Sequence, residues 1–322
     1  MPERLDHSVY PTCEPTDGGM LDLGQGHTMY WQRCGASGGF PFLILHGGPG
    51  GSIQPYYRQL IDPTVFHGVL YDQRGCGRST PRHSLEHNDL PRLVSDIEQL
   101  RRHLGITSWC ILGGSWGSTL ALAYAQAHPE VVAGLVVTGV HLAGEVDRDW
   151  WWYGARSVYP EVWIELAHFL PEGERVRLRD SFLRRVLEGT AEESEAAGLA
   201  LMTYEAHLLD PFPNPDFVAS LAANREATVS MARIFCHYDR NNCFLAEGQL
   251  LREASALADI PGSIVNGRLD MCTPSRSAYD LAQAWPRARL DIVAMAGHRW
   301  NDPNLSRAVV QATDRLGKLV SR

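Results

Sequence analysis

The chain has 322 residues, 44% of them hydrophobic and 20% charged, and a formal net charge of -8 at pH 7. That length and composition predict a globular protein with a substantial core and exclude a disordered or fibrous chain. Basic residues are intermingled with acidic ones, so no continuous basic face is expected, and this disfavours nucleic-acid binding.

The seven cysteines show no CxxC spacing, and an odd number cannot be fully paired within one chain. Reduced thiols in the cytoplasm are therefore the expectation. The first residues lack the basic-then-apolar pattern of a signal peptide, and no apolar run is long enough to cross a bilayer. We expect a cytoplasmic protein without membrane contact. The sequence gives no indication of the oligomeric state.

Strand and helix patterns alternate along most of the chain. Such alternation predicts crossover units, and hence a mainly parallel sheet with helices on both faces. The strand-like apolar runs cover residues 40–45, 69–71, 109–112, 131–140, 263–266 and 290–294. Helical patterns cover residues 93–104, the Ala/Leu-rich stretch before Pro129 and the segment after Pro274.

The alternation stops in the middle of the chain. That part contains three adjacent tryptophans at 150–152, amphipathic helical stretches and the Pro-rich turn 210–215. We interpret residues 141–248 as a helical cap inserted into a core made of residues 1–140 and 249–322. The tryptophans either pack this cap or line a pocket, and their clustering favours packing.

Ser115 is the candidate nucleophile. It lies in residues 113–117 (GGSWG), which match G-x-S-x-G between a predicted strand and a predicted helix. In that context a strained turn lifts the serine oxygen above the sheet, and glycines let strand and helix pass closely. Taken alone, the pattern is equally compatible with an ordinary Gly-rich turn. A phosphate-binding loop at the glycines of 47–51 is disfavoured because no Lys-Ser/Thr pair follows them.

Asp270 and His298 complete the candidate catalytic set. Each follows a strand-like run, and the order Ser, Asp, His is the one used by the α/β-hydrolase fold. His298 would take the Ser115 proton as a general base, and Asp270 would orient the imidazole. Individually, Asp270 could cap the helix after Pro274 and His298 could be a structural loop histidine. Their common order favours a triad and predicts a doubly wound, mainly parallel α/β-hydrolase sheet.

Several stretches resemble the signature segments of the proline iminopeptidase family of serine peptidases. The resemblance implies an α/β-hydrolase core with a helical cap, no metal or other cofactor, and release of an N-terminal residue, usually proline, from small peptides or amides. The segments are 46–50 (HGGPG), 72–79 (DQRGCGRS), 113–118 (GGSWGS), 267–270 (GRLD) and 297–298 (GH).

The same resemblance implies an oxyanion hole. Its donors would be the backbone N–H groups of Gly48, in the loop after the first predicted strand, and of Trp116, directly after the nucleophile.

An aminopeptidase must also bind the free amine of its substrate as a cation, which calls for carboxylates in the cap. Residues 204–206 (YEA) resemble the family's aromatic-Glu element, so Glu205 is the candidate amine anchor; otherwise it is a solvated helix residue. The family's second amine-binding Glu would fall at Phe235, which carries no charge. Asp239 and Glu226 are the nearby acids that would have to replace it.

The predicted function is hydrolysis of an amide through an acyl-enzyme on Ser115, with an aminopeptidase of the proline iminopeptidase type as the first choice. The alternative favoured by Phe235 is an amino-acid amidase or small-ester hydrolase on the same scaffold. An aspartate nucleophile is disfavoured because serine occupies the turn. A non-catalytic ligand-binding protein is the alternative of another class, and the intact set of Ser115, Asp270 and His298 argues against it.

Overall fold

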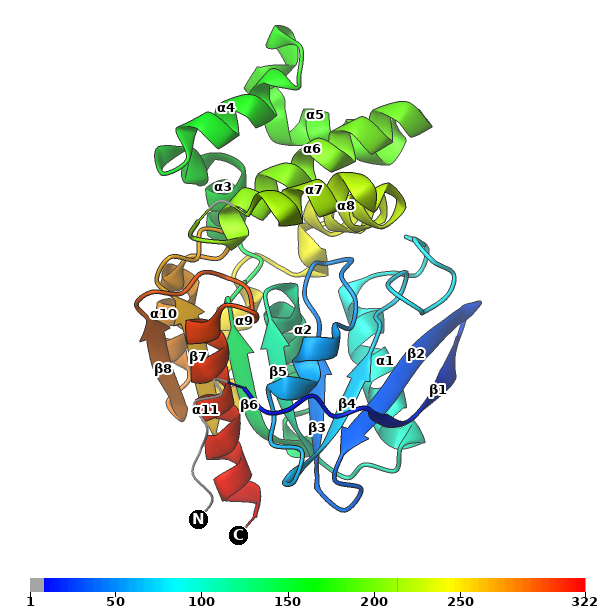
Figure 1. The fold of residues 1–322 in the computed structure, drawn as a ribbon, viewed down its shortest axis with the longest axis vertical. Helices are drawn as coiled ribbons and strands as arrows, with labels where there is room; N and C mark the ends of the chain where they lie inside the picture. The colour runs from blue at the N-terminus through cyan, green and yellow to red at the C-terminus, as the bar shows by residue number, and fades with distance from the viewer. Residues whose placement is uncertain (1–8, 213, 322) are drawn as a thin grey trace.

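An eight-stranded sheet forms the centre of the molecule in the computed structural model, which describes residues 9–212 and 214–321 (Figure 1). The strand order is β1-β2-β4-β3-β5-β6-β7-β8. Strand β2 runs antiparallel to both of its neighbours, and the other neighbouring pairs are parallel. This sheet confirms the predicted fold class. The strands are β1 (Pro15–Gly24), β2 (His27–Gly35), β3 (Phe40–Leu45), β4 (Phe66–Tyr71), β5 (Trp109–Gly114), β6 (Val132–Thr138), β7 (Gly262–Gly267) and β8 (Ala288–Val293).

The two N-terminal strands were absent from the prediction. Strand β1 lies at the edge of the sheet, most of its residues are exposed, and it contains Gly18 and Gly19. It therefore has no apolar run. An edge strand with a solvated face shows at most a weak alternation in sequence, whereas the buried parallel strands read as continuous apolar runs.

Side chains of the central strands alternate between two packed faces. In β3, Phe42 and Ile44 belong to one core cluster and Leu43 and Leu45 to the other. Helix α11 packs on the Phe42 face, and α1, α2 and α10 contribute to the Leu43 face. The helices of the core are α1 (Leu90–His103), α2 (Trp116–Ala127), α9 (Gln249–Arg252), α10 (Ser275–Ala284) and α11 (Pro303–Val320).

Six of the α-helices that the structure describes between β6 and β7 form a separate layer, which we call the helical layer. It lies beyond the carboxyl ends of the parallel strands (Figure 1) and has its own hydrophobic cluster, which includes Trp152, Phe182 and Tyr204. These helices fall within the segment expected to form a cap. They are α3 (Glu145–Asp149), α4 (Pro160–His168), α5 (Leu178–Glu188), α6 (Ala191–Leu209), α7 (Pro215–Ala223) and α8 (Arg225–Arg240).

No helix in the described part of the chain combines the length and the apolar character that crossing a membrane requires.

Candidate active site

Ser115 occupies a sharp turn between the end of β5 and the start of α2. Its φ of 58° and ψ of -129° are unfavourable for a residue with a side chain. The flanking glycines allow the turn: a Cβ on Gly113 would lie 2.1 Å from the Gly117 carbonyl oxygen, and one on Gly117 would lie 2.5 Å from the Leu45 carbonyl oxygen. The turn therefore has the geometry expected of a nucleophile elbow.

Asp270 and His298 are hydrogen-bonded to each other. The distance from His298 Nδ1 to Asp270 Oδ2 is 2.8 Å, although the two residues come from loops after different strands, β7 and β8. The other carboxylate oxygen of Asp270 accepts the Thr273 backbone N–H at 2.7 Å. The N-cap of α10 is Pro274, without a side-chain hydrogen bond, so Asp270 does not cap that helix.

The environment of His298 favours its charged form. Burial alone would lower the pKa of His298, but the charge and hydrogen bond of Asp270, together with the charges of Glu205 and Asp210, outweigh burial and raise it. Because Nδ1 donates to Asp270, the other ring nitrogen, Nε2, remains as the proton acceptor. His298 is thus a buried base whose protonated form is stabilised by a carboxylate.

The Gly-rich loop after β3 lies directly against Ser115. A Cβ on Gly47 would lie 3.0 Å from the Ser115 Cβ, and Gly48, with a φ of 125°, has a backbone conformation that favours glycine. Trp116 begins α2, where backbone N–H groups have no partner within the helix. Gln73 links the two segments: its side chain donates to the His46 carbonyl at 2.8 Å and accepts from the Trp116 indole at 2.9 Å.

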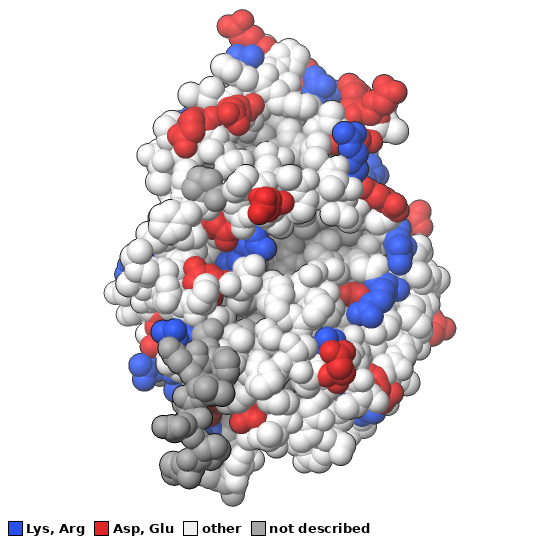
Figure 2. Space-filling model, in the orientation of Figure 1, with Lys and Arg blue, Asp and Glu red and all other residues white. Residues whose placement is uncertain are grey.

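Two adjoining hollows meet at Ser115. An inner cavity of about 50 Å³ extends from Ser115 toward Trp151 and Trp152, and an outer cleft of about 330 Å³ contains both Ser115 and His298. Glu205 lines both hollows. Figure 2 shows the surface hollowed between the helical layer and the core. The inner cavity has room for a small group, and the outer cleft has room for a longer one.

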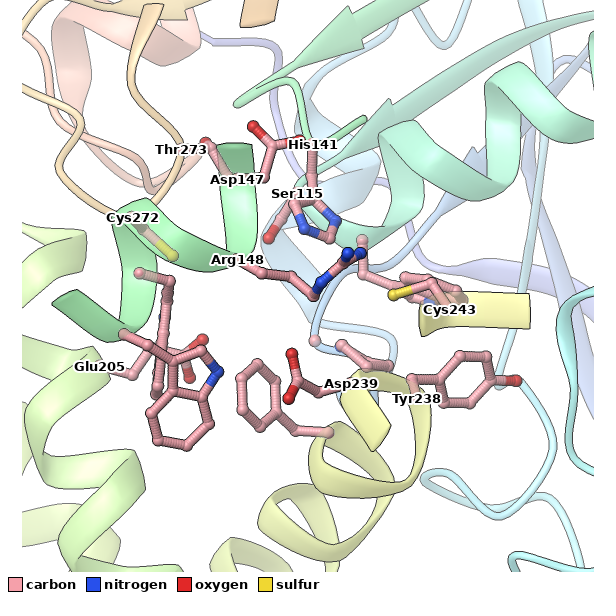
Figure 3. Close-up of a pocket in the computed structure, with 16 residues that line it drawn as sticks. Ser115, His141, Asp147, Arg148, Glu205, Tyr238, Asp239, Cys243, Cys272 and Thr273 are labelled. Atoms are coloured by element: carbon pink, nitrogen blue, oxygen red, sulfur yellow. The ribbon is translucent and has the colours of Figure 1, made fainter. Parts of the chain in front are cut away.

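Glu205 reaches the site from helix α6. Figure 3 shows Ser115 on one side of the inner cavity and Glu205 on another. Burial raises the pKa of Glu205 to about 7, against an opposing effect of His298. Within the described residues the carboxyl group has no hydrogen bond or ion pair. A half-buried carboxylate that faces a cavity and has no partner in the described chain is a strong candidate for binding a cationic group.

Phe235 lines the inner cavity from helix α8 and packs against the tryptophan cluster. Its ring centroid is 4.8 Å from that of Trp151 and 6.3 Å from that of Trp152. Trp151 and Trp152 are buried in the helical layer and also line the cavity, whereas the Trp150 indole donates to the Met271 carbonyl at 2.7 Å. The sequence left packing and pocket lining as alternatives for the tryptophans. Trp151 and Trp152 do both.

The two acids considered as replacements at Phe235 lie in different places. Glu226 is exposed and contacts His83, outside both hollows. Asp239 lines the inner cavity one helical turn after Phe235 (Figure 3), but its Oδ2 is 2.7 Å from Arg179 Nε. Burial raises the pKa of Asp239, and Arg179 opposes this shift. Asp239 is therefore a partly neutralised acid at the cavity wall.

Sequence reasoning missed polar residues at the inner cavity, including His141 and Arg148. His141 follows the end of β6, the position that a parallel sheet brings to the same edge as Ser115, so its place after a strand was a usable signal. Arg148 is held by Glu247 at 3.2 Å and by the Ala143 carbonyl at 2.7 Å. Burial lowers the pKa of His141, although Asp147 opposes this shift.

Comparison with known proteins places the chain in a family. The profile of the alpha/beta hydrolase fold matches residues 41–301. The chain is 41% identical to a proline iminopeptidase of Arabidopsis thaliana over 316 residues, 97% of this chain and 83% of the relative. It is 42% identical to a proline iminopeptidase of Xylella fastidiosa over 309 residues, 95% of this chain and 98% of the relative.

A solved structure shares the fold at lower sequence identity. The crystal structure of a Mycobacterium smegmatis proline iminopeptidase matches with a TM-score of 0.61 and 21% identity, over 94% of this chain and all of that one (100%). A putative lipase of Acinetobacter baumannii matches with a TM-score of 0.66 and 15% identity, over 96% and 92% of the two chains. From the fold and the extent of these matches, the chain belongs to the proline iminopeptidase family of α/β hydrolases.

Proposed function

We propose that this protein is a serine aminopeptidase that releases an N-terminal proline or another small residue through an acyl-enzyme. The observation that carries the proposal is the 2.8 Å bond between His298 Nδ1 and Asp270 Oδ2 in a cleft shared with Ser115 at its strained turn. Relatives about 40% identical over nearly the whole chain are named proline iminopeptidases, which supports the substrate class.

In the proposed acylation step, Ser115 Oγ attacks the substrate carbonyl while its proton passes to His298 Nε2. Asp270 stabilises the imidazolium that forms. The oxyanion is stabilised by the backbone N–H groups of Gly48 and Trp116. When the C–N bond breaks, the imidazolium returns the proton to the leaving amine. Water then attacks the ester carbonyl while its proton passes to the same histidine. When the ester bond breaks, the imidazolium returns that proton to Ser115 Oγ, which releases the amino acid and regenerates the serine.

Substrate orientation follows from the two hollows. The N-terminal residue occupies the inner cavity, with its ammonium group near Glu205, and the rest of the peptide extends into the outer cleft. The small volume of the inner cavity and its walls of Trp151, Trp152 and Phe235 support a compact apolar residue such as proline. In this proposal the segment 141–248 acts as the cap that closes the site.

The function is tested with a panel of aminoacyl anilides, their N-blocked analogues and simple esters. We expect hydrolysis of the prolyl anilide and of other small aminoacyl anilides, and much slower hydrolysis of the blocked ones. A fluorophosphonate probe should label the protein and should fail to label Ser115→Ala, whereas the exposed-serine control Ser157→Ala should label normally. Equal rates on free and blocked amines would overturn the aminopeptidase assignment, and absence of labelling in the folded protein would favour a ligand-binding protein.

A second candidate is an amino-acid amidase or small-ester hydrolase. Phe235 favours it, because an aromatic ring packed on Trp151 stands where the family resemblance implies a second amine-binding carboxylate. Adding prolinamide and short prolyl peptides to the panel separates the two functions, since an amidase would prefer amides or esters with small leaving groups over peptides.

We also propose that the protein works in the cytoplasm. All seven cysteines are free and six of them are buried, which supports a reducing compartment. Detection of the tagged protein in the soluble cytoplasmic fraction of its host would support this placement, and its recovery from an extracytoplasmic fraction would contradict it.

A further inference from the structure

A single guanidinium group lines the outer cleft. Among the lysines and arginines that the structure describes, Arg299 alone contributes to its wall, and it directly follows His298 in the chain. The guanidinium carbon lies 4.0 Å from the ring centroid of Phe217. Its Nη1 donates to Asp210 Oδ2 over 3.3 Å. Aromatic stacking and an ion pair therefore fix the position of this cation.

Most of the hydrogen-bonding capacity of Arg299 is unused. A guanidinium has five N–H donors, and the bond to Asp210 accounts for one of them within residues 9–212 and 214–321. Asp210 lies outside the cleft lining and is also bound by Asn214 at 3.0 Å. The remaining donors form a planar fork of the kind that binds a carboxylate with two parallel hydrogen bonds.

The lining of the outer cleft offers a negatively charged ligand few partners other than Arg299. Much of its wall is aromatic or aliphatic, with Tyr57, Phe217 and Trp300 among its members. Glu205 and His298 also line it. The proposed function assigns Glu205 to the substrate amine and requires a neutral His298 as the base. A carboxylate that enters a largely apolar cleft loses hydration and needs a positively charged partner. Arg299 is the partner that the cleft offers.

The position of Arg299 relates it to the leaving group. His298 protonates the leaving amine in the proposed mechanism, and neighbouring residues of a trans chain have Cα atoms about 3.8 Å apart. Because the side chains of both residues line the outer cleft, the residue that follows the scissile bond would lie on the side of the cleft that contains Arg299. We propose that Arg299 binds the C-terminal carboxylate of the substrate, so that the enzyme prefers dipeptides and tripeptides with a free carboxyl end. This inference rests on the proposed aminopeptidase function.

The test compares Pro-Gly, Pro-Gly-Gly and Pro-Gly-Gly-Gly with their C-terminal amides. We expect kcat/KM to be about tenfold higher for the acid than for the amide at the dipeptide or tripeptide, which corresponds to about 1.4 kcal/mol. The ratio should fall for the longer peptide because each added residue moves the carboxylate by up to about 3.6 Å. A ratio near one at every length would overturn the proposal.

Variants assign the preference to the residue. Arg299→Gln should reduce the acid-to-amide ratio to about one, and Arg299→Lys, which keeps the charge without the fork, should give an intermediate ratio. Arg102→Gln is the matched control, because Arg102 is also an arginine bound to one acid, Glu98, but lies on α1 outside the cleft. An unchanged ratio in Arg299→Gln would overturn the assignment.

A binding measurement separates this inference from the mechanism. In Ser115→Ala, calorimetry should show tighter binding of Pro-Gly than of Pro-Gly amide, and the added Arg299→Gln change should remove the difference. Hydrolysis of prolyl substrates without any acid preference would overturn the role of Arg299 alone. Failure to hydrolyse or bind any of these peptides would overturn the proposed function, and this inference with it.

Discussion

The sheet edge and the helical layer meet at the same cavity but hold their polar residues in different ways. At the sheet edge, the carboxylate of Asp270 is bound by His298 and Thr273. In the helical layer, the half-buried side chain of Glu205 has no hydrogen-bonding partner in the described chain, and Phe235 lines the same cavity with an aromatic ring. The acid of the sheet edge is thus bound by other groups of the protein, whereas the acid of the helical layer is left for a substrate to bind.

From this contrast we expect the sheet edge to carry out the chemistry and the helical layer to select the substrate. Groups that already satisfy one another are suited to chemistry, because they need no reorganisation when charge develops. A buried acid without a partner is suited to selection, because a ligand that supplies the missing cation gains its full interaction. The following variants test that division, from the largest expected effect to the smallest.

The strongest test removes the orienting acid at the sheet edge. Asp270→Asn should lower kcat by about 10⁴-fold, because an amide in place of the carboxylate favours the wrong tautomer of His298 and no longer stabilises the imidazolium. Steady-state rates on a prolyl anilide measure this, and thermal unfolding checks that the variant is folded. A folded variant with a nearly normal rate would show that another acid serves His298.

Neutralising the acid of the helical layer should alter selectivity rather than chemistry. Glu205→Gln should lower kcat/KM for free-amine substrates about 10- to 100-fold, the range expected when a charged hydrogen bond is lost. N-blocked substrates should be affected much less. Glu192→Gln, an exposed change on the same helix, is the control. Equal losses on free and blocked amines would mean that Glu205 has a structural role.

Adding a second acid would sharpen the comparison. Phe235→Glu places a carboxylate at the cavity wall, next to Trp151, and should raise the ratio of free-amine to blocked-amine kcat/KM by about tenfold. The loss of aromatic packing should lower the melting temperature. If the ratio does not change in the folded variant, position 235 does not face the amine.

The smallest expected effect concerns stability. The pKa of Glu205 is raised to about 7 in the folded protein, from 4.5 as its ordinary value, so the folded state keeps a proton that the unfolded state loses. The destabilisation is absent below pH 4.5, grows as the pH rises to 7 and is complete above it. The full shift would correspond to about 3 kcal/mol, but the side chain is only half-buried and solvent reduces the effect. Glu205→Gln should therefore raise the free energy of unfolding by about 1–2 kcal/mol at pH 8 and not at pH 4.5. Urea unfolding at both pH values measures this, and an equal gain at both would exclude the carboxylate as its cause.

Sequence patterns predicted the structure correctly where consecutive residues of a strand are buried. The parallel strands, the turn at Ser115 and the order of Asp270 and His298 all followed from apolar runs that end in loops. The structure brings Asp270 and His298 into contact and places Ser115 in the same cleft. The edge strand β1 was missed because exposure removes its apolar signal.

The cavity of the helical layer was less accessible to sequence reasoning. Helices can be recognised one at a time, but the sequence does not show which of their faces meet across a pocket. Arg148 on α3 and Asp239 on α8 are 91 residues apart, and no local pattern relates them. Glu205 was recognised through a family resemblance, and Arg299 was overlooked although it stands beside the proposed base.

The close packing around the turn at Ser115 limits how this enzyme can be altered. Side-chain atoms on Gly113 or Gly117 would overlap backbone of the turn or of the neighbouring strand, at 2.1 Å and 2.5 Å. Position 115, by contrast, faces open space in the two hollows. A library that varies the reactive group there, for example with cysteine or aspartate, should therefore yield folded proteins far more often than one that varies its two small neighbours. Other reactive groups can therefore be introduced at position 115, provided that positions 113 and 117 remain glycine.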